Sequence, residues 1–335
     1  MKALVAVAAL AATSTAAIDL APPPYAPRAN AAGTLRIWGN PAMQALLERW
    51  IEGFGRARPA IRVEAHLTGS DVGMAALYTG TADIALNGRA ASANEMKAFE
   101  WIYRYQPFAL EIAAGGKKPG SSPPILACVS AANPLSSLTL AQLDAIVSEE
   151  RARGAKAAST WGDLGARGEW AGKPITVYAF DTESGTGRFF RTTVLRDSRK
   201  LRWDRVREFT DSAIAGAGGH DAGRKILAAL ARDRHGLAIT NECAAGSVKA
   251  LPLAGDDASA PIAPTPENVT SRRYPLARPV YAYFNRKPGA KPDAAVAEFL
   301  RYIVSEEGQR AVGGEGSYLP LPPPAAAAEA AKLGS

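Results

Sequence analysis

The chain has 335 residues, of which 39 are Lys or Arg and 32 are Asp or Glu, so its formal net charge is +7. Hydrophobic residues make up 47% and charged residues 21%, a globular balance that excludes wholesale disorder. The basic residues are scattered and are not interleaved with aromatic residues, so the charge does not indicate a nucleic-acid-binding protein.

The first residues have the layout of a secretory signal peptide. Lys2 precedes the short apolar run LVAVAALAAT, and small residues follow it. Cleavage after Ala17 and cleavage after Ala31 both fit the small-x-small pattern, so two sites remain open. The Pro-rich stretch 21–33 is expected to be an extended linker. We therefore expect residues 1–31 to be signal peptide and linker, and the protein to be exported to the periplasm.

The first part of the chain alternates between strand and helix patterns. Apolar residues recur at helical spacing from Met43 to Phe54, whereas residues 61–67 alternate apolar and polar side chains as a strand does. This β-α-β-α-β order predicts a parallel sheet with helices on its faces. The expected strands are 34–38, 61–67 and 82–86, and the expected helices begin at residues 43 and 71.

The same alternation continues beyond the turn-rich segment 115–124, which we expect to cross between two lobes. The fold class is therefore α/β. The tail 323–335, rich in Pro and Ala, is expected to fray. The remaining expected strands are 125–129, 175–180, 236–240 and 278–284. Helices are expected near 140–147, 222–232 and 294–312, and a further helix carries Phe189, Phe190, Val194 and Leu195.

Small polar turns stand between a strand and the following helix at three places. They are Gly39-Asn40, Thr68-Gly69-Ser70 and Glu183-Ser184-Gly185-Thr186. Helix N-termini leave backbone N–H groups unpaired and carry partial positive charge, and hydroxyl groups add donors. Such turns lie at the carboxyl ends of strands, where open α/β sheets bind ligands. Each turn is also ordinary N-capping sequence, but the three together predict an oxyanion site.

Several segments resemble one known family. GSDVGMAALYTGTADIALNGR (69–89) is similar to the Gly-Ser…helix…Gly-x-Ala-Asp-Ile segment of the phosphate-type solute-binding proteins of ABC transporters. SGTGRFF (184–190) resembles the Ser-Gly-Thr helix start of that family. The likeness extends over residues 34–322, and the segments 132–148, 161–165, 168–178 and 316–322 are also similar to the family.

The resemblance implies the two-lobed type II periplasmic-binding-protein fold, with a mostly parallel sheet flanked by helices in each lobe and the ligand in the cleft. Residues 34–115 with 270–322 would form the first lobe, and residues 116–269 the second. It also implies a monomeric, non-catalytic protein without a cofactor. This protein would deliver phosphate or a related oxyanion to an inner-membrane ABC permease.

The family's ligand-binding positions are only partly kept. Ser70, Ser184, Gly185 and Thr186 match its phosphate-binding residues, and Asn40 and Ala42 fall where it has a small residue and a hydroxyl residue. Phe180 stands where classical members carry an arginine, and Gly88 stands beside Asn87 where many carry a proton-accepting aspartate. Without that aspartate, selection against sulfate should weaken, so a small oxyanion is a firmer expectation than phosphate itself.

Other residues offer replacements for the two that are missing. Arg89 or Arg188 would supply the positive charge, because a guanidinium can make two parallel hydrogen bonds to an oxyanion. Asp71 or Asp181 would accept the proton of hydrogen phosphate. Both arginines also fit as solvated surface charges. The expected ligand-binding set therefore includes Asn87, Gly88 and these four charged residues.

A second hypothesis keeps the fold but changes the ligand. An aromatic side chain at Phe180 would suit an organic or phospho-organic ligand, bound by a sensor or scavenger without transport. An enzyme is not expected, because the chain lacks a Gly-x-Ser-x-Gly elbow. No metal site is expected either, because the three histidines lie far apart. Cys128 and Cys243 would form a disulfide or remain free thiols.

Overall fold

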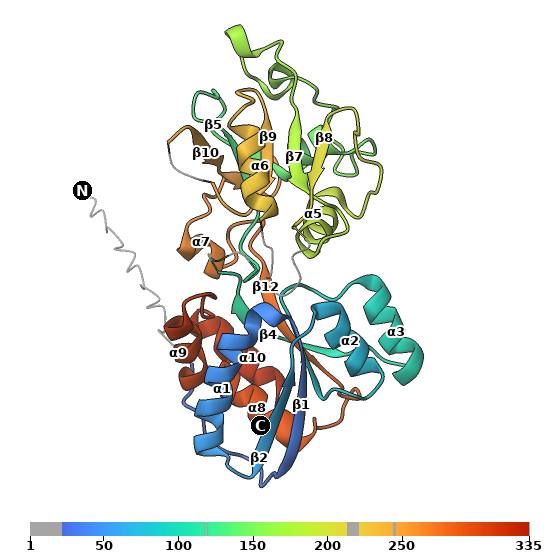
Figure 1. The fold of residues 1–335 in the computed structure, drawn as a ribbon, viewed down its shortest axis with the longest axis vertical. Coiled ribbons are helices and arrows are strands. Elements are labelled where there is room, and N and C mark those ends of the chain that lie inside the picture. Colours follow the sequence, from blue (N-terminus) through green and yellow to red (C-terminus); the bar gives the residue numbers. More distant parts are fainter. Residues whose placement is uncertain (1–21, 117, 119, 213–220, 244–245, 335) are drawn as a thin grey trace, which may run out of the picture.

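The computed structural model describes residues 22–116, 118, 120–212, 221–243 and 246–334, and these form two lobes (Figure 1). Each lobe is built on one five-stranded sheet with helices beside it. This arrangement confirms the expected two-lobed α/β fold. Within the described ranges, no helix is long and apolar enough to span a bilayer. The apolar run of the expected signal peptide lies outside the described residues.

The first lobe combines the N-terminal part of the chain with a returning strand. Its sheet has the order β2-β1-β3-β12-β4. β1 runs parallel to β2 and β3, whereas β12 runs antiparallel to β3 and β4. The sheet is therefore mixed and not mostly parallel, because β12 returns from the other lobe against its neighbours. The strands are β1 (Gly33–Gly39), β2 (Ile61–His66), β3 (Ile84–Asn87), β4 (Phe108–Ala114) and β12 (Pro279–Phe284).

Helices cover both faces of this sheet (Figure 1). α1 buries Leu46, Trp50 and Phe54, the apolar stripe that the helical spacing predicts. The expected helix 294–312 is divided, because Ser305 has extended backbone and its hydroxyl caps the next helix. The bounds are η1 (Pro41–Met43), α1 (Gln44–Ala57), α2 (Ser70–Tyr78), α3 (Ala93–Tyr103), α8 (Ala294–Val304), α9 (Glu306–Glu315) and α10 (Pro323–Lys332).

The second lobe has a sheet of order β10-β5-β9-β7-β8. β7 is parallel to β8 and β9, whereas β5 is antiparallel to β9 and β10, so this sheet is mixed too. Its strands are β5 (Leu126–Ser130), β7 (Val177–Phe180), β8 (Val206–Phe209), β9 (Leu237–Thr240) and β10 (Val248–Leu251). A short parallel pair, β6 (Leu138–Thr139) and β11 (Leu253–Ala254), lies beside it.

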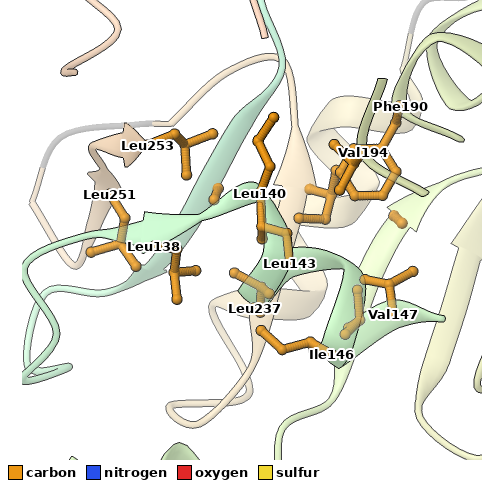
Figure 2. Close-up of a cluster of buried hydrophobic side chains, with 14 of the residues drawn as sticks. Leu138, Leu140, Leu143, Ile146, Val147, Phe190, Val194, Leu237, Leu251 and Leu253 are labelled. Atoms are coloured by element: carbon orange, nitrogen blue, oxygen red, sulfur yellow. The ribbon is translucent and has the colours of Figure 1, made fainter. Parts of the chain in front are cut away.

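The core of the second lobe fills the space between α4, α5 and the sheet (Figure 2). Leu143 and Val147 of α4 belong to the same buried cluster as Phe190 and Val194 of α5, with Leu237 of β9. This packing fixes the N-terminus of α5 relative to the sheet. The helices of the lobe are α4 (Leu140–Val147), η2 (Trp161–Leu164), η3 (Gly168–Trp170), α5 (Gly185–Leu195), α6 (Ala222–Leu230) and α7 (Pro266–Thr270).

Two crossing segments join the lobes. The N–H of Ile125 on the first segment donates to the carbonyl of Leu276 on the second, at 3.1 Å. Tyr274 and Leu276 are buried in the core of the second lobe, and the Tyr274 hydroxyl donates to the Ile125 carbonyl. Residues 270–277 therefore belong with the second lobe. The expected boundary at residue 270 is too early, because the aromatic side chain anchors the chain there.

The tail 323–335 was expected to fray, but most of it is helical. It forms α10, in which Ala326 is fully buried. The Glu329 carboxylate accepts the N–H of Glu111 on β4 at 3.1 Å, and Arg286 donates to the Lys332 carbonyl at 2.8 Å. Small alanine side chains allow this close packing against the first lobe.

The N-terminal stretch also departs from a free linker. Glu298 on α8 has no exposed surface, and its carboxylate accepts the Tyr25 hydroxyl at 2.7 Å and the N–H groups of Arg28 and Ala29 at 3.1 Å. The Tyr25 ring also makes edge contacts with Tyr302. Residues 22–31 are therefore docked on the first lobe, because they satisfy a buried carboxylate.

The two cysteines are free thiols that pack in one cluster of the second lobe. Cys128 is fully buried, and its Sγ donates to the Glu242 carbonyl at 3.7 Å. Burial raises the pKa of the Cys128 thiol well above its usual range.

Replacement of Tyr25 tests the docking of the N-terminal stretch. Tyr25→Ala removes ring packing and one hydrogen bond to a buried carboxylate, so we expect the free energy of unfolding in urea to fall by about 2–3 kcal/mol. Tyr25→Phe keeps the ring and should cost about 1 kcal/mol. Unchanged stability of Tyr25→Ala would mean that residues 22–31 do not dock in solution.

Candidate functional site

A cavity of about 250 Å³ lies between the lobes and receives residues from both. All three predicted turns reach it, through Asn40 at the end of β1, Ser70 at the start of α2 and Ser184 at the start of α5. Its lining consists of Asn40, Pro41, Gly69, Ser70, Asp71, Gly88, Arg89, Gly120, Ser122, Pro123, Phe180, Ser184, Gly185, Thr186, Arg188, Asp211, Asn241 and Arg278.

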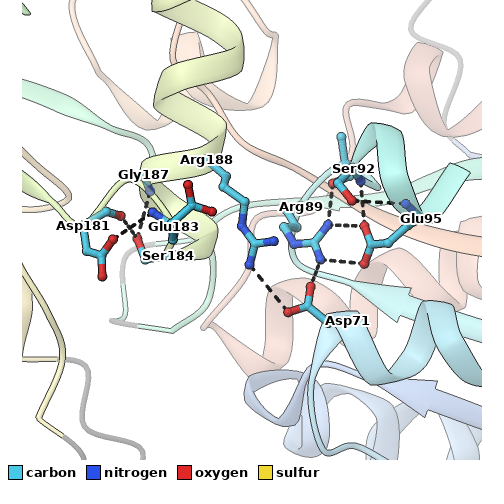
Figure 3. Close-up of polar contacts among 10 residues, drawn as sticks. Asp71, Arg89, Ser92, Glu95, Asp181, Glu183, Ser184, Gly187 and Arg188 are labelled. Atoms are coloured by element: carbon cyan, nitrogen blue, oxygen red, sulfur yellow. Dashed lines mark hydrogen bonds and ion pairs between the residues drawn. The ribbon is translucent and has the colours of Figure 1, made fainter. Parts of the chain in front are cut away.

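The helix N-termini present hydrogen-bond donors to this cavity. Gly185 and Thr186 are the first two residues of α5, and N–H groups at that position have no partner within a helix. Ser184 caps the helix, because its hydroxyl accepts the Gly187 N–H at 3.0 Å and donates to the Asp181 carbonyl at 2.6 Å (Figure 3). α2 has Gly69 at its cap position and no side-chain cap, so its own first N–H groups are not covered by a side chain.

Three of the predicted site residues do not line the cavity. The Ala42 N–H donates to Asn40 Oδ1 at 2.9 Å and so belongs to the helix cap. Asp181 Oδ1 accepts the Glu183 N–H within its own turn. Asn87 is fully buried, and neither atom of its amide has a hydrogen-bond partner among the described residues. These residues are neighbours of lining residues along the chain but do not themselves line the cavity.

Gly88 stands where the family resemblance called for an aspartate, and a side chain there would require Ser122 and Asn40 to shift. A Cβ atom at Gly88 would lie 2.4 Å from Ser122 Oγ and 2.5 Å from Asn40 Nδ2. The Ser122 hydroxyl donates to the Gly88 carbonyl at 2.5 Å. Ser122 therefore occupies the space beside Gly88, and the crossing segment brings it there.

The two candidate arginines are engaged in ion pairs (Figure 3). Arg89 is 7% exposed, and its guanidinium donates to both carboxylate oxygens of Glu95 at 2.8 Å and also to Asp71. Burial alone would lower the pKa of Arg89, but the hydrogen bond and charge of Glu95, with those of Asp71, raise it overall. Arg188 of the second lobe lies 3.5 Å from the other oxygen of Asp71, so this carboxylate links the lobes.

Sequence reasoning missed four polar residues of the lining: Ser122, Asp211, Asn241 and Arg278. The Asp211 carboxylate accepts the Ala222 N–H at 2.9 Å, and Arg278 Nη1 donates to Thr186 Oγ1 at 3.0 Å. Ser122 and Arg278 come from the two crossing segments. The turn-rich composition of 115–124 was a signal for the first crossing, but no motif marked either residue.

Phe180 contacts the cavity but belongs mainly to the core. Only 7% of its surface is exposed, and it packs in one buried cluster with Ile226 and Ala238. Its ring therefore offers little surface for stacking against an organic ligand. Among the described residues, no group of three or more His, Cys, Asp or Glu side chains could hold a metal ion.

A small cavity between two α/β lobes, lined by helix N-termini, hydroxyl groups and arginines, defines a solute-binding protein of the two-lobed class. A family model described as a PBP superfamily domain matches residues 25–307. The chain is also 32% identical over 316 residues to the phosphate-binding protein PstS of Pseudomonas aeruginosa, with 93% of this chain and 90% of that protein covered. The chain therefore belongs to the phosphate-type solute-binding proteins of the PBP superfamily, which confirms the resemblance.

Solved structures show the same fold at lower identity. A possible phosphate-binding protein from Planctomyces limnophilus matches with a TM-score of 0.55 and 20% identity, covering 91% of this chain and 99% of that one. An ABC-type phosphate transport receptor from Vibrio cholerae also has a TM-score of 0.55 and 20% identity, covering 85% and 99%.

Substitution at Gly88 tests the crowding beside it. Gly88→Ala places a methyl group against Ser122 Oγ and Asn40 Nδ2, so we expect a loss of about 1–3 kcal/mol in the free energy of unfolding in urea. Gly55→Ala is the matched control, because nothing lies within 4 Å of a Cβ there and α1 would gain about 0.5–1 kcal/mol. Equal stability of both variants would show that the space beside Gly88 is open.

Proposed function

We propose that this protein captures phosphate, or a closely related tetrahedral oxyanion, and delivers it to an ABC permease in the membrane. The convergence of three strand-to-helix turns on one cavity between the lobes carries this proposal. Helix N-termini bind oxyanions because their free N–H groups and partial positive charge face the ligand. The name of the Pseudomonas relative, a phosphate-binding protein, supports the same ligand.

The donors come from both sides of the cavity, which supports capture by closure of the lobes. Ser70 and Asn40 lie on the first lobe, whereas Gly185 and Thr186 lie on the second. An anion held by both sets ties the lobes together, so the bound protein differs in shape from the free one. The anion favours the closed shape because it binds that shape more tightly. A permease that binds the closed shape would therefore select the loaded protein.

The site serves binding and release, not turnover. The Pseudomonas relative is named as a binding protein, and the described lining contains no histidine that could act as a base on Ser70 or Ser184. The proposal also takes the protein to be an exported monomer that needs no cofactor. The alternative of an organic ligand draws no support from Phe180, because that ring is mostly buried.

The absence of a carboxylate at Gly88 bears on how the site distinguishes phosphate from sulfate. A carboxylate in an anion site accepts a bond from a protonated oxyanion and repels a fully ionised one. Asp71 carries the ion pairs to Arg89 and Arg188, and Asp211, the other carboxylate of the lining, accepts the Ala222 N–H. Both carboxylates are therefore engaged in other contacts. The cleft should therefore discriminate poorly between phosphate and sulfate.

Calorimetric titration of ligand-stripped protein with phosphate and then sulfate tests this function. We expect both anions to bind, with affinities within about tenfold of each other, because one buried hydrogen bond accounts for roughly a tenfold difference. No binding of either anion would contradict the proposal. Discrimination beyond a hundredfold would mean that a carboxylate does accept the phosphate proton.

Substitutions of two hydroxyl residues test where the anion binds. Ser70→Ala removes a donor from the lining and should weaken phosphate binding about 3–10-fold. Thr79→Ala removes a hydroxyl beyond the opposite end of the same helix, where it donates to the Ala75 carbonyl, and should leave the affinity unchanged. Equal affinities for the two variants would place the anion elsewhere.

A further inference from the structure

We infer that Arg278 is the main positive charge that binds the anion, in place of the arginine that Phe180 replaces. This inference rests on the proposed oxyanion function. Arg278 lies on the second crossing segment, immediately before β12, and lines the cavity between the lobes. It was not among the residues that the turns or the family motifs indicated.

Arg278 is deeply buried for a cation that has no carboxylate partner among the described residues. The residue is 5% exposed, and its guanidinium makes one hydrogen bond within the described part of the chain, from Nη1 to Thr186 Oγ1 at 3.0 Å. Nε is buried without a hydrogen-bond partner. A guanidinium has five N–H donors, so most of its capacity is unused.

The other two arginines of the lining have carboxylate partners, although Nε of Arg188 is also buried without a hydrogen-bond partner. Both carboxylate oxygens of Glu95 are bound to Arg89, and Asp71 contacts Arg89 as well as Arg188. Arg278 has no carboxylate within ion-pair distance among the residues that the structure describes. An anion at Arg89 would compete with existing ion pairs, whereas an anion at Arg278 would meet an unpaired charge.

The electrostatics at Arg278 favour an added anion. Burial lowers its pKa to about 10, and the positive charge of Arg89 lowers it too, although Tyr318 acts in the opposite direction. The group is still charged at neutral pH. Phe189 provides partial compensation, because its ring centroid lies 5.5 Å from the Arg278 guanidinium carbon. Since an unpaired buried charge is costly, a bound oxyanion would remove a penalty as well as add hydrogen bonds.

The position of Arg278 also links ligand binding to the hinge. Its side chain reaches Thr186 at the N-terminus of α5, and its backbone carbonyl accepts the N–H of Gly115 on the first crossing segment at 2.7 Å. An anion bridging Arg278 and the N–H groups of α5 would therefore connect the second lobe to both crossing segments. The planar fork of arginine suits an oxyanion because it donates two parallel hydrogen bonds.

Two substitutions at Arg278 test the inference. Arg278→Met removes the charge but keeps an apolar stem, so the ligand-free protein should unfold about 2–4 °C higher, whereas phosphate affinity should fall about 100-fold or more. Arg278→Lys keeps the charge but loses the fork, and its phosphate affinity should fall about tenfold. Thermal unfolding and calorimetric titration with phosphate measure both effects.

Arg202→Met is the matched control. Arg202 is another partly buried arginine, but it donates to the Ala158 carbonyl and to Ser159 away from the cavity, so its loss should leave phosphate affinity unchanged. Phosphate affinity of Arg278→Met within threefold of the wild type would overturn the inference. If that variant does not fold, wild-type affinity of Arg278→Lys overturns it instead. Failure of the wild-type protein to bind phosphate or sulfate would reject the proposed function itself.

Discussion

The pairing of the two crossing segments is the constraint on which the cleft depends. The Gly115 N–H donates to the Arg278 carbonyl at 2.7 Å, and the Ile125 N–H donates to the Leu276 carbonyl at 3.1 Å. The segments approach so closely that a Cβ atom at Gly115 would lie 1.6 Å from the Ser122 carbonyl oxygen. Only glycine permits this contact, which sets Ser122 and Arg278 against the cavity from the hinge side.

Each lobe contributes one part of the site, next to the crossing segments. In the first lobe, β1 and β3 end beside Asn40 and Gly88, and α2 begins at Ser70. In the second lobe, the packed core of α4 and α5 holds the N-terminus of α5 against the cavity. Asp71 joins the halves by pairing with Arg89 of its own lobe and Arg188 of the other. Each lobe therefore holds its own donors in place, which lowers the entropy lost when the two sets meet on a small anion.

The sequence predicted the features that depend only on residues close together in the chain. The apolar spacing of α1 and the small residues at Ser70 and Ser184 depend on neighbouring residues, so sequence periodicity and capping rules identified them. The same local reasoning included Asn87 and Asp181, which do not line the cavity. These residues stand next to site residues in the chain, but Asn87 is buried and Asp181 binds its own turn.

Contacts between distant segments could not be predicted in this way. Arg278 reaches Thr186 across 92 positions of the chain, and Tyr25 reaches Glu298 across 273. Neither pair shares a motif, and each forms only because the lobes and the docked ends bring the segments together. The helix at 323–332 is a similar case, because an Ala-rich segment is ordered by the surface that it packs on and not by its own composition.

A crystal structure of the protein grown with phosphate would test directly whether Arg278 binds the anion. We expect tetrahedral density between the lobes, in contact with the Arg278 guanidinium, the N–H groups of Gly185 and Thr186, and Ser70. An empty cleft at saturating phosphate, or an anion bound to Arg89 with Arg278 left unpaired, would contradict it.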